Sequence, residues 1–192
     1  MPKIEYGIKN VYFAKRTEDA SGNITYATPI AVPNARSTDL AAQGDQTAVY
    51  ADNIQIYTTN TNQGYNGSLA FTYIPDEIRE QFLNEKRDVS GNLFEDANAQ
   101  QVTFAMMFQF ETDVKAIRHL FYNCTLTRPN IASSTKETGV SVNDKSLTIT
   151  ALPDNKLLPG YDIVKIKTTE TTEETVYNEW FNEVYIPEVV EI

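Results

Sequence analysis

Residues 101–112 alternate large apolar side chains with smaller or polar ones at every second position. This period of two is that of a β-strand, in which successive side chains point to opposite faces. One face would carry only large apolar groups, so we expect a central strand packed on a hydrophobic core. That face consists of Val102, Phe104, Met106, Phe108 and Phe110.

The segment that follows continues the same period after a short link at residues 111–113. Two alternating segments joined by a short link predict an antiparallel hairpin, here the longest of the fold. Its second strand, residues 114–127, is expected to place on one face Val114, Ala116, Leu120, Tyr122 and Cys124. Further strands are expected at residues 9–16, 23–27, 68–74, 146–151 and 161–168.

One helix is expected at about residues 75–86. Pro75 suits the start of a helix, the acidic pair Asp76 and Glu77 suits its first turn, and basic residues follow at the far end. A weaker helical turn is expected at residues 174–181, with a buried side formed by Tyr177, Trp180, Phe181 and Val184. Together these patterns predict a mainly β (α+β) fold in a single domain over residues 1–192. We expect the helix at 75–86 to pack on a sheet through its apolar stripe of Ile78, Phe82 and Leu83.

Residues 36–66 interrupt this pattern with a long polar stretch rich in Thr, Asn, Gln and Ala. A structureless loop of this length is uncommon in a compact domain unless it has a function. Residues 49–58 contain enough apolar groups for a strand but not for a core of their own. We expect a polar β-extension that pairs with a neighbouring chain, or else an ordinary surface excursion with no partner.

The acidic charge of the chain is unevenly distributed. The formal net charge is −10, and no Lys or Arg occurs at residues 37–78 or after Lys167. Seven glutamates follow Lys167: Glu170, Glu173, Glu174, Glu179, Glu183, Glu188 and Glu191. Such asymmetry indicates either a solvated acidic face or a surface that repels a polyanion, and it argues against a surface that neutralises phosphates.

Residues able to carry chemistry are few. The only histidine, His119, and the only cysteine, Cys124, lie five positions apart on an expected strand, so we expect them on opposite faces and not as a dyad. The eight glycines are scattered instead of clustered before a helix, and no metal-ligand pattern is present. We therefore expect no enzyme activity, no cofactor, no metal site and no catalytic residue.

The same sequence predicts neither a membrane protein nor a secreted one. No apolar stretch approaches the ~20 residues that a membrane helix needs. The first residues lack the apolar run of a signal peptide. We expect a chain that folds in a cytoplasm, where a single cysteine forms no internal disulfide.

Several short segments, in order along almost the whole chain, resemble the major tail proteins of long-tailed, non-contractile bacteriophages that infect Gram-positive bacteria. Each is short, and the ordered set carries the resemblance. The segments are GIKNVY at 7–12, GD at 44–45, YADN at 50–53, PD at 75–76, DANAQ at 96–100, FAMMF at 104–108, RHLFYNC at 118–124, RP at 128–129 and VYNEWF at 176–181.

The resemblance implies a tail-tube protein, a structural subunit of the virion that is assembled in the host cytoplasm. It also implies a two-sheet antiparallel β-sandwich or barrel flanked by the helix at 75–86. Six copies would close into a ring, and stacked rings would form a hollow tube. Its implied partners are other copies of itself, the tape-measure protein in the lumen, and the distal tail and tail-terminator proteins, with DNA passing through unbound. The polar extension would make the subunit or ring contacts, through Asp45, Tyr50, Asp52, Tyr57 and Tyr65.

The net charge of the chain and the exposed edges expected for its strands are both consistent with a tube of this kind. Six copies would carry 6 × (−10) = −60 formal charges, so acidic walls would let DNA slide. A ring that merges sheets would also remove exposed strand edges.

Two alternatives stay open at this point. One is a receptor- or carbohydrate-binding β-sandwich at the tail tip, with Tyr57, Tyr65 and Tyr73 as candidate aromatic contacts. The other is the tube subunit of a contractile or secretion machine.

Overall fold

The computed structural model of the chain describes residues 4–133 and 143–188, and these residues form a mainly β fold with two short helices. The strands are β1 (Glu5–Glu18), β2 (Ile24–Tyr26), β3 (Ile30–Ala31), β4 (Ala35–Gln43), β5 (Gln46–Ala51), β6 (Ile54–Asn60), β7 (Gly64–Phe71), β8 (Lys86–Arg87), β9 (Leu93–Phe94), β10 (Thr103–Thr112), β11 (Ile117–Leu126), β12 (Lys145–Leu152), β13 (Asp154–Leu158), β14 (Tyr161–Ile163) and β15 (Lys165–Lys167). The helices are α1 (Asp76–Phe82) and α2 (Glu174–Glu179). The predicted fold class, mainly β with a flanking helix, is confirmed.

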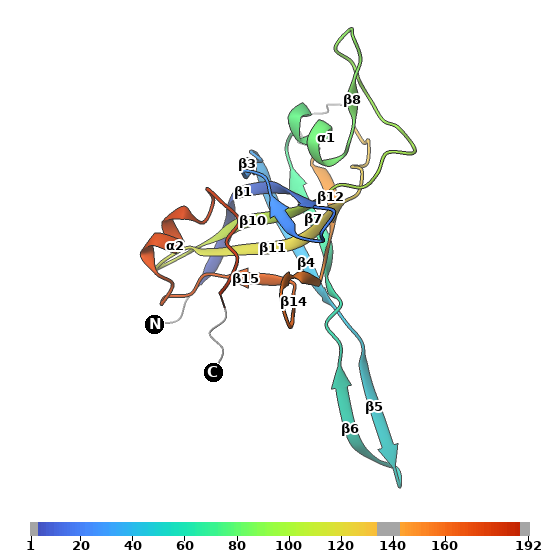
Figure 1. The fold of residues 1–192 in the computed structure, drawn as a ribbon, viewed down its shortest axis with the longest axis vertical. Coiled ribbons are helices and arrows are strands. Elements are labelled where there is room, and N and C mark those ends of the chain that lie inside the picture. Colours follow the sequence, from blue (N-terminus) through green and yellow to red (C-terminus); the bar gives the residue numbers. More distant parts are fainter. Residues whose placement is uncertain (1–3, 134–142, 189–192) are drawn as a thin grey trace, which may run out of the picture.

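One large antiparallel sheet forms the body of the molecule (Figure 1). Its strand order is β2-β1-β10-β11-β12-β7-β4, with β3 added to β1 and β15 added to β11. Each strand pair in this sheet is antiparallel, and the central pair is the expected β10–β11 hairpin. Three two-stranded ribbons, β5–β6, β8–β9 and β13–β14, complete the β-structure of the described residues.

The main core lies on one face of the curled sheet. Phe13 of β1, Phe104 of β10 and Phe82 of α1 pack together, with ring centroids 4.7–5.4 Å apart. Helix α1 adds Ile78, so the helix closes one end of this core, as the apolar stripe in its sequence predicts. The expected core face of β10 is confirmed, because Phe104, Met106 and Phe108 are all buried here.

The opposite face of β10 is also buried, which the alternating pattern did not predict. Ala105 and Met107 lie in a second cluster around Trp180, which follows α2. Tyr12 of β1 stacks on Phe181 at 5.0 Å between ring centroids. Helix α2 and the C-terminal segment therefore form a cover over the second face of the sheet, in agreement with the helical turn expected there.

A β-bulge in β11 changes which side chains share a face. Phe104 pairs with Cys124 and Met106 pairs with Phe121. Two steps along β10 therefore correspond to three steps along β11, so β11 contains one extra residue here. Cys124 consequently joins the main core, whereas Leu120 and Tyr122 lie in the second cluster. The prediction that these three residues share one face is wrong for Cys124.

The same bulge corrects the expectation for His119 and Cys124. His119 stacks against Phe108 at 5.2 Å, so it lies on the core side together with Cys124. The two residues are on the same face and not on opposite faces. They remain separated along β11, by roughly 15 Å at the usual rise per strand residue.

Helix α1 is shorter than the expected span of residues 75–86. Asn84 has a left-handed φ of 57°, which ends the helix, and the N–H of Glu85 returns to the carbonyl of Arg79 at 3.2 Å. Lys86 and Arg87 then form strand β8 and do not continue the helix. In the described ranges neither helix, at 7 and 6 residues, is long and apolar enough to cross a membrane.

Candidate functional site

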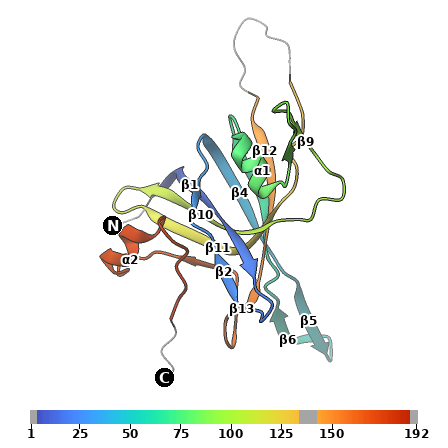
Figure 2. The ribbon, with the colours of Figure 1, turned by 45° about the horizontal axis from the view of Figure 1, so that its top comes forward.

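The most distinctive feature of the molecule is a two-stranded ribbon that projects from the body (Figure 1). It consists of β5 and β6, residues 46–60, and we call it the arm. The arm continues β4 and leads back into β7, two strands that are paired with each other in the main sheet. Figure 2 shows the same projection from a second direction. The predicted β-extension at 36–66 therefore consists of a base within the sheet and an arm outside it.

The tip of the arm is a tight two-residue turn. Asp52 and Asn53 have φ values of 52° and 63°, and Ala51 pairs with Ile54 across them. Two positive φ values define the hairpin turn whose twist matches that of the strands, and Asp and Asn tolerate this conformation. The expectation of one strand over residues 49–58 is therefore wrong, because the chain reverses at Asp52-Asn53.

The two faces of the arm differ in chemistry. Cross-strand partners share a face, so the pairs Val49–Tyr57 and Ala51–Ile54 form one apolar face. Val49, Ile54 and Tyr57 are 46%, 68% and 60% exposed. The arm thus presents an apolar surface to solvent without a core beneath it.

The opposite face of the arm is largely polar. Tyr50 pairs there with Gln55, and the amide of Gln55 donates a hydrogen bond to the hydroxyl of Thr58. The register shifts by one residue after Val49, which leaves Ile56 as the extra residue of a bulge. The bulge increases local twist, and the pairs on either side of it assign Val49, Tyr57 and Ile54 to one face and Tyr50 and Gln55 to the other.

A narrow neck joins the arm to the sheet. A side chain at Gly44 would place its Cβ 1.9 Å from the carbonyl oxygen of Thr61, so only glycine fits this crossing. The next residue, Asp45, holds the crossing together, since its carbonyl accepts from the N–H of Thr61 at 3.0 Å. The amide of Gln63 donates to the carboxylate of Asp45 at 3.3 Å. These contacts fix the direction in which the arm leaves the body.

The five residues predicted to make subunit contacts fall in different places. Asp45 lies in the neck, Tyr50 and Asp52 lie at the distal end of the arm on or beside its polar face, and Tyr57 lies on the apolar face. Tyr65 is not on the arm. It lies on β7, half-buried, with its ring edge-on to Phe121 at 5.3 Å. Sequence reasoning missed Val49 and Ile54 as members of the apolar face, although the turn signal at residues 52–53 would have revealed the pairing.

The charge of the arm is wholly acidic. Asp45 and Asp52 are its only charged residues, counting the neck, and no Lys or Arg occurs between Arg36 and Arg79. An acidic arm repels an identical arm at close range but is attracted to a basic surface on another chain.

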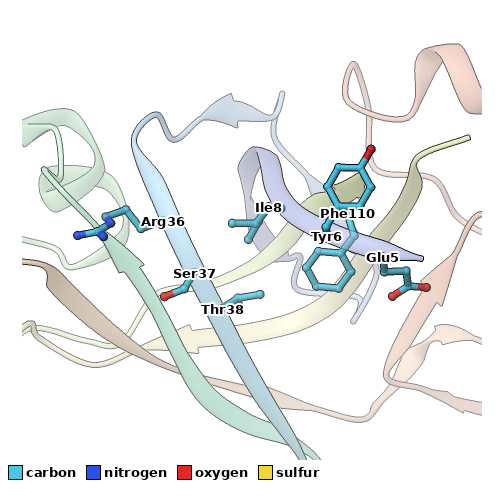
Figure 3. A pocket seen from close by; sticks show the side chains of 8 residues that line it. Glu5, Tyr6, Ile8, Arg36, Ser37, Thr38 and Phe110 are labelled. Atoms are coloured by element: carbon cyan, nitrogen blue, oxygen red, sulfur yellow. The ribbon is translucent and has the colours of Figure 1, made fainter. Parts of the chain in front are cut away.

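A second notable surface is the seam between β1 and β4. The β4 strand ends the path of the large sheet, and the first half of β1 lies opposite its free edge without a ladder between them. Figure 3 shows this hollow, with Tyr6, Ile8 and Phe110 on one side and Ser37 and Thr38 of β4 on the other. Two unpaired strand edges therefore face each other across an apolar floor.

The candidate catalytic groups of the sequence have environments that suppress reactivity. Burial, helped by Lys165 and Lys167, lowers the pKa of His119 to about 4, so the ring is neutral near pH 7. Burial raises the pKa of the Cys124 thiol, which holds it in its unreactive protonated form. Within the described ranges, no group of three or more His, Cys, Asp or Glu residues is arranged to hold a metal ion.

The three tyrosines considered for a carbohydrate site do not form one platform. Tyr57 lies on the arm, Tyr65 lies near the start of β7, and Tyr73 lies two residues beyond its end, so the chain places these last two roughly 25 Å apart at the usual rise per strand residue. A sugar-binding surface needs aromatic rings within the length of a short glycan.

Comparisons with known proteins give no family assignment. No protein-family model matches the sequence, and no curated protein matches it significantly.

Proposed function

We propose that this protein is a structural subunit that assembles through its arm into rings, which stack as the hollow tail tube of a long-tailed, non-contractile bacteriophage. The observation that carries the proposal is the arm itself, a projecting ribbon with an exposed apolar face and no core. The ordered resemblance to phage major tail proteins supplies the kind of assembly.

The energetics of the arm favour a partner. An isolated two-stranded hairpin is marginally stable at best in water. Covering Val49, Ile54 and Tyr57 would contribute roughly 1.5–3 kcal/mol for each large apolar side chain that becomes fully buried. A second chain can provide this cover, because the arm extends away from its own body (Figure 1).

The asymmetry of such a contact favours a ring or a filament. The arm of one copy would contact the body of another, so the two surfaces are different. Contacts between two different surfaces close into rings or continue as filaments, whereas a self-complementary patch gives a two-fold dimer. Free strand edges at β4 and β1 are available to a neighbouring chain in the same assembly.

The charge of the chain fits a conduit for nucleic acid. With −10 per copy, a ring of six would carry −60 formal charges, which disfavours adhesion of DNA to the protein. In such a tube the lumen would hold the tape-measure protein before infection and DNA during ejection, and the distal tail and terminator proteins would bind the ends. These partners rest on the resemblance.

The proposal is tested by replacing residues 46–60 with a two-residue turn and measuring sedimentation at increasing protein concentration. We expect the wild-type chain to form large species and the shortened chain to remain a monomer with unchanged circular dichroism. This replacement spares Leu40 and Tyr65, which pack against the core from β4 and β7.

A matched control removes exposed apolar side chains from another part of the molecule. Val89 is fully exposed and Phe94 is 49% exposed in the segment after α1, so the double change Val89→Ser and Phe94→Ser removes apolar surface away from the arm. We expect this control to assemble as the wild type does. Normal assembly of the shortened chain would refute the proposal.

A further inference from the structure

A groove continues the β1–β4 seam across the core face of the sheet. Its floor contains four aromatic residues from β10 and β11, of which Phe108 and Phe121 are buried, at 2% and 3% exposed, and Phe110 and His119 are partly exposed. Thr38 and Phe110 line both the seam and this groove, so the two hollows are adjoining. The result is an elongated hollow beside the free edge of β4, on whose floor Phe110 and His119 are partly exposed.

The groove exists because the sheet divides at this point. Strand β11 pairs with β12 at residues 123–126, but it pairs with β15 at residues 119–121. Strands β12, β7 and β4 curve away on one side, and β15 forms the other wall. Between these walls Phe110 and His119 stay partly exposed, whereas helix α1 covers the other end of the core.

The wall formed by β15 is basic. Lys165 pairs with Phe121 and Lys167 with His119, so both lysines lie on the same face as the aromatic floor. The ammonium of Lys165 lies 4.4 Å from the ring centroid of Tyr65. Among the groove-lining residues the acidic group is Asp39, and His119 is neutral near pH 7 because its pKa is lowered to about 4. The groove is therefore aromatic with a net basic wall.

We propose that this groove receives the arm of a second copy of the chain. The apolar face of the arm, with Tyr57 at its centre, would cover the partly exposed rings of Phe110 and His119, and Asp52 at the tip would lie near Lys165 and Lys167. The inference rests on the proposed function and adds to it the surface on which the arm docks.

Three properties make the arm the fitting occupant. The arm is an extended ribbon, and the free edge of β4 offers unpaired main-chain groups to an incoming strand. The arm carries only acidic charge, whereas β15 contributes two lysines. The arm also leaves its own body along the direction of β4 and β7, so it is carried away from the groove of its own chain (Figure 1).

The test uses a photoreactive residue in the full-length protein. p-Benzoylphenylalanine replaces Tyr57 on the apolar face in one variant and Tyr50 on the polar face in the matched control. The two positions are similarly exposed, at 60% and 64%, so they differ mainly in the face that they occupy. Mixing each variant with isotope-labelled wild-type chain identifies captured peptides as belonging to another copy.

We expect the probe at position 57 to capture labelled peptides from β4, β10, β11 or β15, at a yield roughly tenfold above the probe at position 50, because a docked arm raises the local concentration of one face only. Capture of a different surface, equal capture from both positions, or no capture at any concentration overturns the inference. If tubes form while the captured peptide lies elsewhere, the docking surface is wrong and the proposed function stands. A chain that neither assembles nor cross-links contradicts both.

A double-mutant cycle tests the charge contact. Asp52→Asn keeps a residue that tolerates the turn conformation, and Lys165→Met together with Lys167→Met keeps the apolar stems of the lysines. We expect Asp52→Asn to weaken assembly roughly two- to fivefold in the wild-type background, as for an exposed ion pair. In the methionine background it should have no further effect. Equal effects of Asp52→Asn in both backgrounds contradict the placement of Asp52 beside the lysines.

Discussion

Val49 and Tyr57 lie directly opposite each other across the arm, whereas the next residue along β5, Tyr50, lies on the other face with Gln55. Adjacent residues of a strand point in opposite directions, so this register separates an apolar face from a largely polar one. A shift of one residue would mix the two faces. The tight turn at Asp52-Asn53 fixes the register and thereby defines the surface through which we propose that copies associate.

The aromatic cluster at the centre of the main core predicts the effect of a core truncation. Phe104 is fully buried, with its ring 4.7 Å from Phe13 and 5.4 Å from Phe82. We expect Phe104→Ala to lower the free energy of unfolding by about 3–5 kcal/mol, because it removes buried contacts and leaves a cavity. Urea denaturation followed by circular dichroism measures this loss. The control Phe94→Ala, at a half-exposed position, should cost under about 1 kcal/mol.

A buried ion pair links β1 to β13. The Nε of Arg16 donates to the Oδ2 of Asp154 at 2.9 Å, and the side chains are 10% and 1% exposed. We expect Asp154→Ala to destabilise the protein by about 3–5 kcal/mol, because it leaves the Arg16 charge buried without its partner. The double variant Arg16→Met with Asp154→Leu should be markedly more stable than Asp154→Ala in the same urea titration. If the single and double variants lose equal stability, an unpaired charge is not the cause.

His119 makes stability depend on pH in acid. Its folded-state pKa is about 4, below the ordinary 6.5, because the ring is buried and faces Lys165 and Lys167. The unfolded chain therefore binds this proton first, so stability falls as the pH drops from 6.5 to 4 and is unaffected by His119 above that window. We expect a loss on the order of 1–3 kcal/mol, reduced from the full shift because the ring is partly exposed.

The comparison of His119→Gln with the wild type isolates this contribution from the carboxylates, which titrate equally in both proteins. Urea midpoints at several pH values between 4 and 7 measure it. The difference in unfolding free energy between the two proteins should change across this range and level off above pH 6.5. A constant difference would show that His119 titrates normally in the folded protein.

Local patterns in the sequence predict much of this fold. The period of two in residues 101–112 identifies β10, and the proline followed by two acids identifies the start of α1. A β-bulge, which inserts one extra residue into a strand, is harder to predict from the sequence. The bulge in β11 moves Cys124 to the other face, and no spacing rule signals it. The burial of Ala105 and Met107 depends on α2, which is about 70 residues away in the chain.

The arm, too, could be predicted from the sequence only in part. Its polar composition and length predict an extension at residues 36–66, but composition does not reveal where the chain reverses. Asp and Asn are favoured in turns, so the pair Asp52-Asn53 was the available indication that Tyr50 and Tyr57 lie on different strands. The basic wall of the groove could not have been predicted, because Lys165 joins Phe108 and His119 of the β10–β11 hairpin only when the distant strand β15 pairs with β11.

The most direct test of the central claim is negative-stain electron microscopy of the purified full-length protein at high concentration, beside the chain whose residues 46–60 are replaced by a short turn. We expect rings or hollow tubes of uniform diameter for the full-length protein, with six-fold symmetry in end-on averages, and single particles for the shortened chain. Full-length protein that forms neither rings nor tubes at any concentration, or a shortened chain that forms the same tubes, would contradict the central claim.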